Sequence, residues 1–170
     1  TAAHNGHAET ACLLLDRGAN VNVTDNDGCT ALMFAAHRDH TEAVSLLAER
    51  GARLEAAMNG GLTALMLAVS KGHLEAATLL MDRGARVDNT EDSGRTALMD
   101  AASRGCFEMV ELLLAHGADR ELRDAAGLTA LDIARKENKM DVAARLLVDS
   151  AFGTSATPSS DSPTLSSDSY

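Results

Sequence analysis

The pattern of apolar and polar positions predicts pairs of short helices. Between residues 91 and 123, Ala97, Leu98, Ala101 and Ala102 fall at helical spacing, and a second apolar run follows a few residues later. Its apolar residues, all predicted to be buried, are Val110, Leu112, Leu113 and Leu114. Polar residues rich in Asp, Asn and Gly connect one such pair to the next, which is typical of a projecting, hairpin-like turn.

Threonine and glycine residues predict where these helices begin and end. Thr96 precedes the first run, where its hydroxyl can cap free backbone N–H groups. Gly105 is predicted to end the first helix, and Gly117 to close the second one with a left-handed residue. The unit is therefore two antiparallel helices and a turn.

The same unit recurs along the chain with a period of 33 residues. The period is carried by three series of identical residues: Gly28, Gly61, Gly94 and Gly127; Thr30, Thr63, Thr96 and Thr129; Leu32, Leu65, Leu98 and Leu131. A fixed period of this length predicts a solenoid, in which each unit buries its apolar face only against its neighbours.

The two ends of the chain differ from the middle. The array is predicted to span residues 1–148, with a partial repeat at 1–24, full repeats at 25–57, 58–90 and 91–123, and a capping repeat at 124–148. In the last repeat Arg135 and Arg145 replace apolar residues, as expected where nothing stacks on a terminal face. Residues 149–170 are rich in Ser, Thr, Pro and Asp, and we expect this tail to be disordered.

The charge, the cysteines and the length of the apolar runs narrow the range of possible functions. The formal net charge is −10, which argues against sequence-independent binding to nucleic acid. Three scattered cysteines are typical of a reduced, intracellular protein, cytoplasmic or nuclear. No apolar run approaches the roughly 20 residues that span a bilayer, so no membrane association is expected. We expect a monomer.

The repeated block resembles the ankyrin repeat. The family pattern G-x-T-P-L-H-x-A-A-x-x-G-H-x-E-x-V-x-x-L-L-x-x-G-A is matched by GCTALMFAAHRDHTEAVSLLAERGA (28–52) and by GLTALMLAVSKGHLEAATLLMDRGA (61–85). Alanine replaces the family's proline, and Met33, Met66 and Met99 replace its histidine, so apolar packing is expected to substitute for that histidine's hydrogen bonds. The resemblance implies an all-α solenoid of stacked antiparallel helix pairs whose concave face binds a protein partner.

Most recurring charges have structural explanations. Acidic residues such as Glu42 and Glu75 fall in the first turn of the second helix, and cations such as Arg50 and Arg83 in its last turn, where each suits the helix dipole. A row of three cations at the end of the first helix, Arg38, Lys71 and Arg104, has two interpretations. It can serve the helix dipole, or it can select an acidic segment of a partner.

Two further sets of positions are candidates for contact with a partner. Phe34, Leu67, Asp100 and Ile133 form a row predicted to lie on the exposed flank of the first helices. Residues at the turn tips vary from repeat to repeat, as either a tailored surface or unconstrained loops would. The predicted partner-binding residues are Asp27, Cys29, Phe34, His37, Arg38, Asn59, Leu62, Leu67, Lys71, Asp92, Arg95, Asp100 and Arg104.

No catalytic, cofactor or metal motif is apparent. Three of the six histidines (His7, His40 and His73) fall at one repeated position, and no converging set of three or four ligands can be seen, so neither a metal nor a cofactor is expected. The sequence therefore favours a protein–protein interaction module over an enzyme. The alternative is a non-catalytic targeting or regulatory segment of a larger enzyme or signalling protein.

Overall fold

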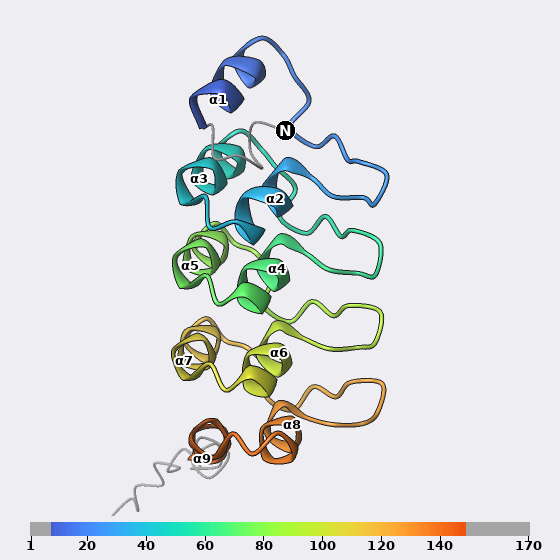
Figure 1. Cartoon of the computed structure of the whole chain (residues 1–170), viewed down its shortest axis with the longest axis vertical. Coiled ribbons are helices and arrows are strands. Elements are labelled where there is room, and N and C mark those ends of the chain that lie inside the picture. The colour runs from blue at the N-terminus through green and yellow to red at the C-terminus, as the bar shows by residue number, and fades with distance from the viewer. Residues whose placement is uncertain (1–7, 149–170) are drawn as a thin grey trace, which may run out of the picture.

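The computed structural model describes residues 8–148. Within that range the chain forms helices in stacked pairs joined by projecting loops (Figure 1). The tail predicted to be disordered, 149–170, lies outside the described residues.

The helices form two layers (Figure 1). The first helices of the pairs form one layer: α2 (Ala31–His37), α4 (Ala64–Lys71), α6 (Ala97–Arg104) and α8 (Ala130–Lys136). The second layer holds α1 (Ala8–Asp16), α3 (Thr41–Glu49), α5 (Leu74–Asp82), α7 (Phe107–Ala115) and α9 (Met140–Val148). The loops project to one side of the first layer. This arrangement confirms the predicted all-α solenoid.

Threonine caps start every helix of the first layer. The hydroxyl of Thr96 accepts a hydrogen bond from the Met99 backbone N–H, with 3.3 Å between the heavy atoms. Thr30, Thr63 and Thr129 make the equivalent bond in their own units. Helix α6 ends at Arg104, with Gly105 in the left-handed conformation, as the sequence predicts.

The core lies between the layers and between successive pairs. It is built mainly from Ala, Leu, Val and Met, and Met33, Met66 and Met99 belong to it with at most 5% of their surface exposed. Met33 also accepts a hydrogen bond from the Thr30 N–H through its sulfur, at 3.4 Å. Burial of these methionines confirms that apolar packing replaces the histidine of the family pattern.

The second helix of each unit is less deeply buried than the sequence predicts. Of the four apolar residues predicted to be buried in α7, Val110 and Leu113 are fully buried, but Leu112 and Leu114 are only half-buried. The reason is that α7 forms the outer layer, so only the stripe that faces α6 and the neighbouring second helices is enclosed.

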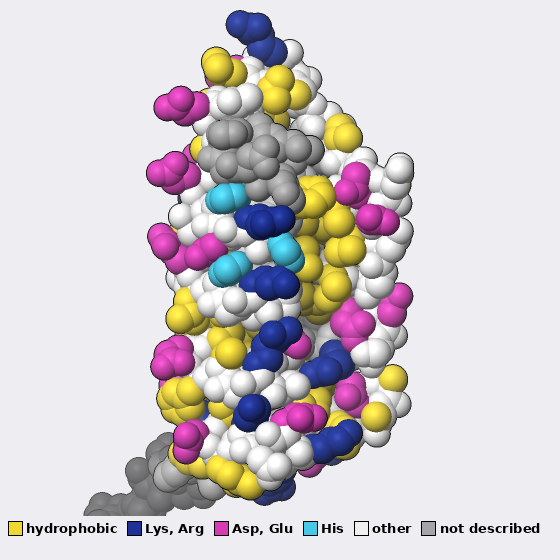
Figure 2. Space-filling model, viewed as in Figure 1, with side chains coloured by type: hydrophobic (Ala, Val, Ile, Leu, Met, Phe, Trp, Pro, Cys, Tyr) yellow, Lys and Arg dark blue, Asp and Glu magenta, His cyan; other side chains and the backbone are white. Residues whose placement is uncertain are grey.

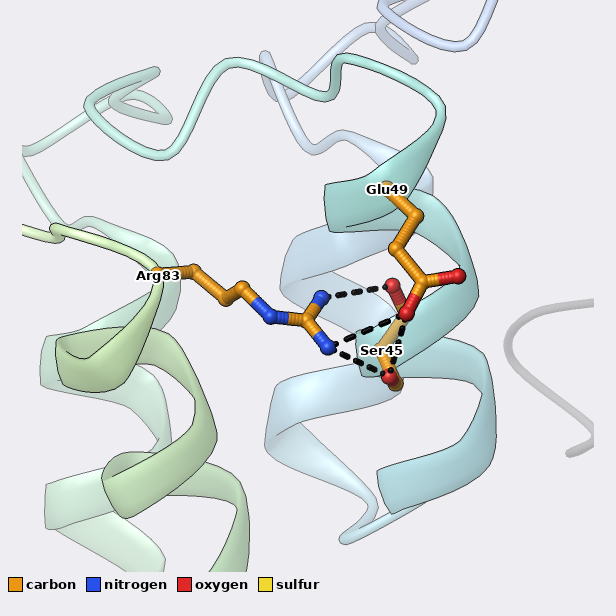
Figure 3. A network of polar contacts seen from close by, with 3 residues as sticks. All are labelled: Ser45, Glu49 and Arg83. Atoms are coloured by element: carbon orange, nitrogen blue, oxygen red, sulfur yellow. Dashed lines mark hydrogen bonds and ion pairs between the residues drawn. The ribbon is translucent and has the colours of Figure 1, made fainter.

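Cations at the ends of the second helices hold successive pairs together. Arg83, which follows α5, reaches back to α3 and donates to the Ser45 carbonyl (3.0 Å), the Ser45 hydroxyl (2.9 Å) and the Glu49 carboxylate (3.1 Å) (Figure 3). Arg50 contacts Asp16 in the same way, at 2.6 Å. The helix dipole alone therefore does not explain these cations. Each arginine also forms an ion pair, called here a clasp, with an acidic residue 34 positions earlier.

The last clasp changes the interpretation of the capping repeat. Arg145, predicted to face solvent at the end of the stack, is half-buried and pairs with Glu111 of α7. Its position is therefore used for contact with the preceding pair. Arg135, the other predicted capping charge, is exposed.

The loops are narrow hairpins that stack on one another. Isolated antiparallel bridges close them, between Thr24 and Thr30, Ala57 and Thr63, and Thr90 and Thr96. At their tips the backbone N–H of one loop donates to a carbonyl of the loop before it, as from Asn59 to Asp27 at 2.8 Å. Each tip is thereby fixed relative to its neighbours.

Candidate functional site

The face shown in Figure 2 carries a strip of hydrophobic side chains bordered by charges of opposite sign. A column of Lys, Arg and His side chains runs down one side of the strip, and acidic side chains gather on the hairpin side. The hydrophobic surface is widest in the upper half of this face, toward the N-terminal pairs. Two hollows open along the groove between the first helices and the hairpins.

The first hollow, called here the apolar hollow, has a volume of about 230 Å³. It lies between α2 and α4, and its walls are almost wholly apolar. The lining residues are Cys29, Met33, Phe34, His37, Arg38, Met58 and Leu67. Phe34 and Leu67 are half-buried, so each side chain offers part of its surface to an incoming group.

Turn chemistry places Cys29 at the edge of the apolar hollow. A carboxylate oxygen of Asp25 accepts hydrogen bonds from the backbone N–H groups of Asp27 and Cys29, each at 2.9 Å. This closed turn directs the Cys29 sulfur toward the Met58 sulfur, 3.7 Å away. Burial, helped by the nearby carboxylates of Asp25 and Asp27, raises the pKa of the Cys29 thiol. Cys29 therefore contributes a neutral, soft surface.

The second hollow, called here the polar hollow, has a volume of about 330 Å³ and lies between α4 and α6. Its lining residues are Leu62, Met66, Ser70, Glu91, Ser93, Arg95, Thr96, Ala97 and Asp100. The Ser93 hydroxyl donates a hydrogen bond to the Glu91 carboxylate and lowers the pKa of Glu91. The hollow therefore holds a fixed negative charge beside the guanidinium of Arg95.

Asp100 also affects the row of cations at the ends of the first helices, Arg38, Lys71 and Arg104. Arg104 donates through Nε to the Asp100 carboxylate at 3.0 Å, one helical turn away. The charge of Arg104 is therefore compensated locally. Arg38 and Lys71, in the N-terminal part of the row, are both exposed.

The row of Phe34, Leu67, Asp100 and Ile133 is not on an exposed flank. The first three side chains are half-buried because they line the two hollows, and Ile133 is buried, with 6% of its surface exposed. Ile133 belongs to the continuous hydrophobic core, so it is not available for contact.

The structure brings together only some of the predicted partner-binding residues. The apolar hollow collects Cys29, Phe34, His37, Arg38 and Leu67. The polar hollow collects Leu62, Arg95 and Asp100. Asp27, Asn59 and Asp92 are exposed at the hairpin tips and line neither hollow.

Sequence reasoning missed Met58, which forms a wall of the apolar hollow. The sequence does distinguish Met58, because the residues at the same position of the other units are acidic: Asp25, Glu91 and Asp124. In those units the carboxylate accepts hydrogen bonds from its own turn, as Asp124 does from Ala126 and Leu128. Met58 cannot accept these hydrogen bonds, but its side chain adds apolar surface to the hollow.

Within residues 8–148, no group of three or more His, Cys, Asp or Glu side chains is arranged to hold a metal ion. A search of the same residues for a bilayer-spanning helix, which needs a long and strongly apolar stretch, finds none.

Comparison with known families agrees with the geometry. A model of ankyrin repeats in three copies matches residues 1–91, and a second model of ankyrin repeats in many copies matches residues 80–134. The chain belongs to the ankyrin-repeat family. Both matches are to a non-catalytic module that typically mediates contacts between proteins. Among curated proteins, no match to this chain is found.

Proposed function

We propose that the chain is a protein–protein interaction module that binds a segment of a partner protein in the groove, with the apolar hollow as its principal anchor site. The observation that carries this proposal is the half-buried pair Phe34 and Leu67, which lines a hollow that no side chain of the described residues fills. Aromatic and aliphatic anchors in such hollows contribute most of the energy of an interface.

Charge supports a partner segment that is acidic beside its anchor. Arg38 and Lys71 are exposed at the ends of α2 and α4, on a chain whose formal net charge is −10. A positive site on an acidic molecule favours negatively charged segments and disfavours basic ones. In the polar hollow Glu91 lies beside Arg95 and Asp100 is paired with Arg104, so these compensated charges favour a hydrogen-bonding side chain instead.

The test compares two double variants in affinity capture from a native lysate. Phe34→Ala/Lys71→Glu removes the anchor surface and reverses the exposed charge. Leu13→Ala/Arg17→Glu makes a matched change at exposed residues that line neither hollow. We expect the first variant to lose at least tenfold of each specifically recovered partner, while the second retains them.

Circular dichroism shows whether both variants keep the helical fold. If the folded Phe34→Ala/Lys71→Glu protein still recovers every partner at the level of the unaltered chain, the groove is not the binding site. The other interpretation, a targeting segment of a larger enzyme or signalling protein, stays a prediction, as do the monomeric state and the intracellular location.

A further inference from the structure

A second surface, on the other helix of each pair, carries large apolar side chains that the stack does not bury. The first residues of α5, α7 and α9 are Leu74, Phe107 and Met140, which are 33 residues apart. Their exposed fractions are 41%, 40% and 61%. The corresponding residues of α1 and α3, Ala8 and Thr41, are small. The row is therefore a property of the C-terminal half of the array.

An acidic row runs directly beside this apolar row. Glu75, Glu108 and Asp141 are the second residues of the same helices, and all three are exposed. None of them forms an ion pair with another residue of the described part. Figure 2 shows acidic and hydrophobic side chains alternating along the lower half of its left edge, which the second helices form.

The surface is hollowed where α7 meets α9. A shallow depression of about 550 Å³ is lined by Phe107, Glu108, Asp141, Ala144, Arg145 and Val148. Val148 is itself 54% exposed. Arg145 is occupied by Glu111, so the carboxylates of Glu108 and Asp141 give the depression its charge.

We propose that this surface, called here the helix-2 row, binds a basic amphipathic helix of a partner protein. Apolar residues of that helix would cover Leu74, Phe107 and Met140, and its Lys or Arg residues would pair with the adjacent carboxylates. Packed helices lie about 8–10 Å apart, and seven residues of an α-helix rise about 10.5 Å. A helix lying along the stack thus meets successive units with side chains seven positions apart, all on one face.

Other occupants fit less well. In a β-strand, residues three apart span about 10 Å but point to opposite faces, so a strand cannot repeat the contact at each unit. Residues 149–170 carry Asp149, Asp161 and Asp168 and no cation, which opposes binding beside an acidic row. A second copy of the chain would bring two negative surfaces together.

The experiment measures fluorescence anisotropy of three labelled helical peptides with the full chain. The first peptide has leucines at seven-residue spacing flanked by lysines. The second has glutamates in place of the lysines, and the third has the composition of the first with its leucines scattered around the helix. We expect the first peptide to bind at least tenfold more tightly than the other two, and more weakly as salt is raised. Equal binding of the three, or no binding, would overturn the proposal.

Variants locate the site and separate it from the groove. Phe107→Ser/Met140→Ser and Glu108→Lys/Asp141→Lys should each weaken binding of the first peptide at least tenfold, because the changed side chains are exposed and the fold is kept. Phe34→Ala/Lys71→Glu should leave that binding unchanged. If only the groove variant weakens it, the peptide binds in the groove. Sedimentation that shows a dimer broken by Phe107→Ser/Met140→Ser would assign the surface to a second copy instead.

Discussion

The interior of the stack and the groove follow opposite rules, although both are built by the same 33-residue units. In the interior some rows keep a single residue type, as Leu32, Leu65 and Leu98 do, and each of these side chains is at most 2% exposed. In the groove each row changes type: Phe34 and Leu67 give way to Asp100, and Met58 interrupts a row of acids. Stacking therefore constrains the residue type at these leucine positions, whereas the groove positions differ between units.

The largest expected effect separates an interior leucine from a groove leucine. Leu113 is fully buried, so Leu113→Ala should lower the free energy of unfolding by roughly 2–5 kcal/mol. Leu67 is half-buried, and Leu67→Ala should cost clearly less. Urea melts measure both. A loss below about 1 kcal/mol for Leu113→Ala, or equal losses, would contradict the distinction, given the range known for buried leucines.

Two neighbouring glycines provide a finer test of stacking between hairpins. Gly60 and Gly61 both have positive φ, 97° and 82°. A Cβ at Gly61 would lie 2.9 Å from the Glu91 Cα in the next hairpin, whereas a Cβ at Gly60 meets nothing within 4 Å. Gly60→Ala should cost about 1 kcal/mol for the backbone conformation alone.

Gly61→Ala must add a shift of the neighbouring hairpin to that cost, so we expect a total of about 2–3 kcal/mol in the same melts. Equal losses for the two variants would show that the hairpin tips are not held against one another.

Capping is expected to matter less than packing. Thr63 is buried, and its hydroxyl accepts from the Met66 N–H at 3.4 Å. Thr63→Ala should therefore cost about 1 kcal/mol. Thr78, in the middle of α5, donates only to the Leu74 carbonyl of its own helix, so Thr78→Ala should change stability by less than about 0.5 kcal/mol. Thermal melts that rank the two variants in reverse would refute the capping role.

The smallest effect is expected at His116, which belongs to neither the interior nor the groove. A hydrogen bond to the Leu112 carbonyl, assisted by Asp82, raises the pKa of His116 above its ordinary value of 6.5. The folded state thus binds the proton more tightly than the unfolded chain. This stabilisation is complete below pH 6.5 and is lost as the pH rises through the folded-state pKa.

Melting temperatures at pH 5.5 and pH 8 should therefore differ more for the unaltered chain than for His116→Gln, which does not titrate. An identical pH dependence of the two proteins would show that the clasp from His116 to Asp82 contributes nothing.

The sequence predicts the stack well because its signals are local or periodic. Thr96 and Gly105 bound α6 as predicted, since caps depend only on nearby backbone groups. The pair of Asp100 and Arg104 could also have been predicted, because residues four apart meet on one helix face. The half-burial of Phe34 could not, because it depends on how closely the hairpin folds over α2. The clasps required knowledge of the offset between neighbouring helices, which is 34 residues and not the 33 of the repeat.

The polar contacts between pairs have a mechanical consequence. Within residues 8–148, several polar contacts hold the junction from α3 to α5: the clasp of Arg83, the bonds from Arg86 and Asn89 to Glu55, and the bond between hairpin tips. At the junction from α7 to α9 the polar contacts include the Arg145 pair and the tip bond from Ala125 to Ser93. Under tension along the axis of the stack, we therefore expect the junction between α7 and α9 to separate before the junction between α3 and α5.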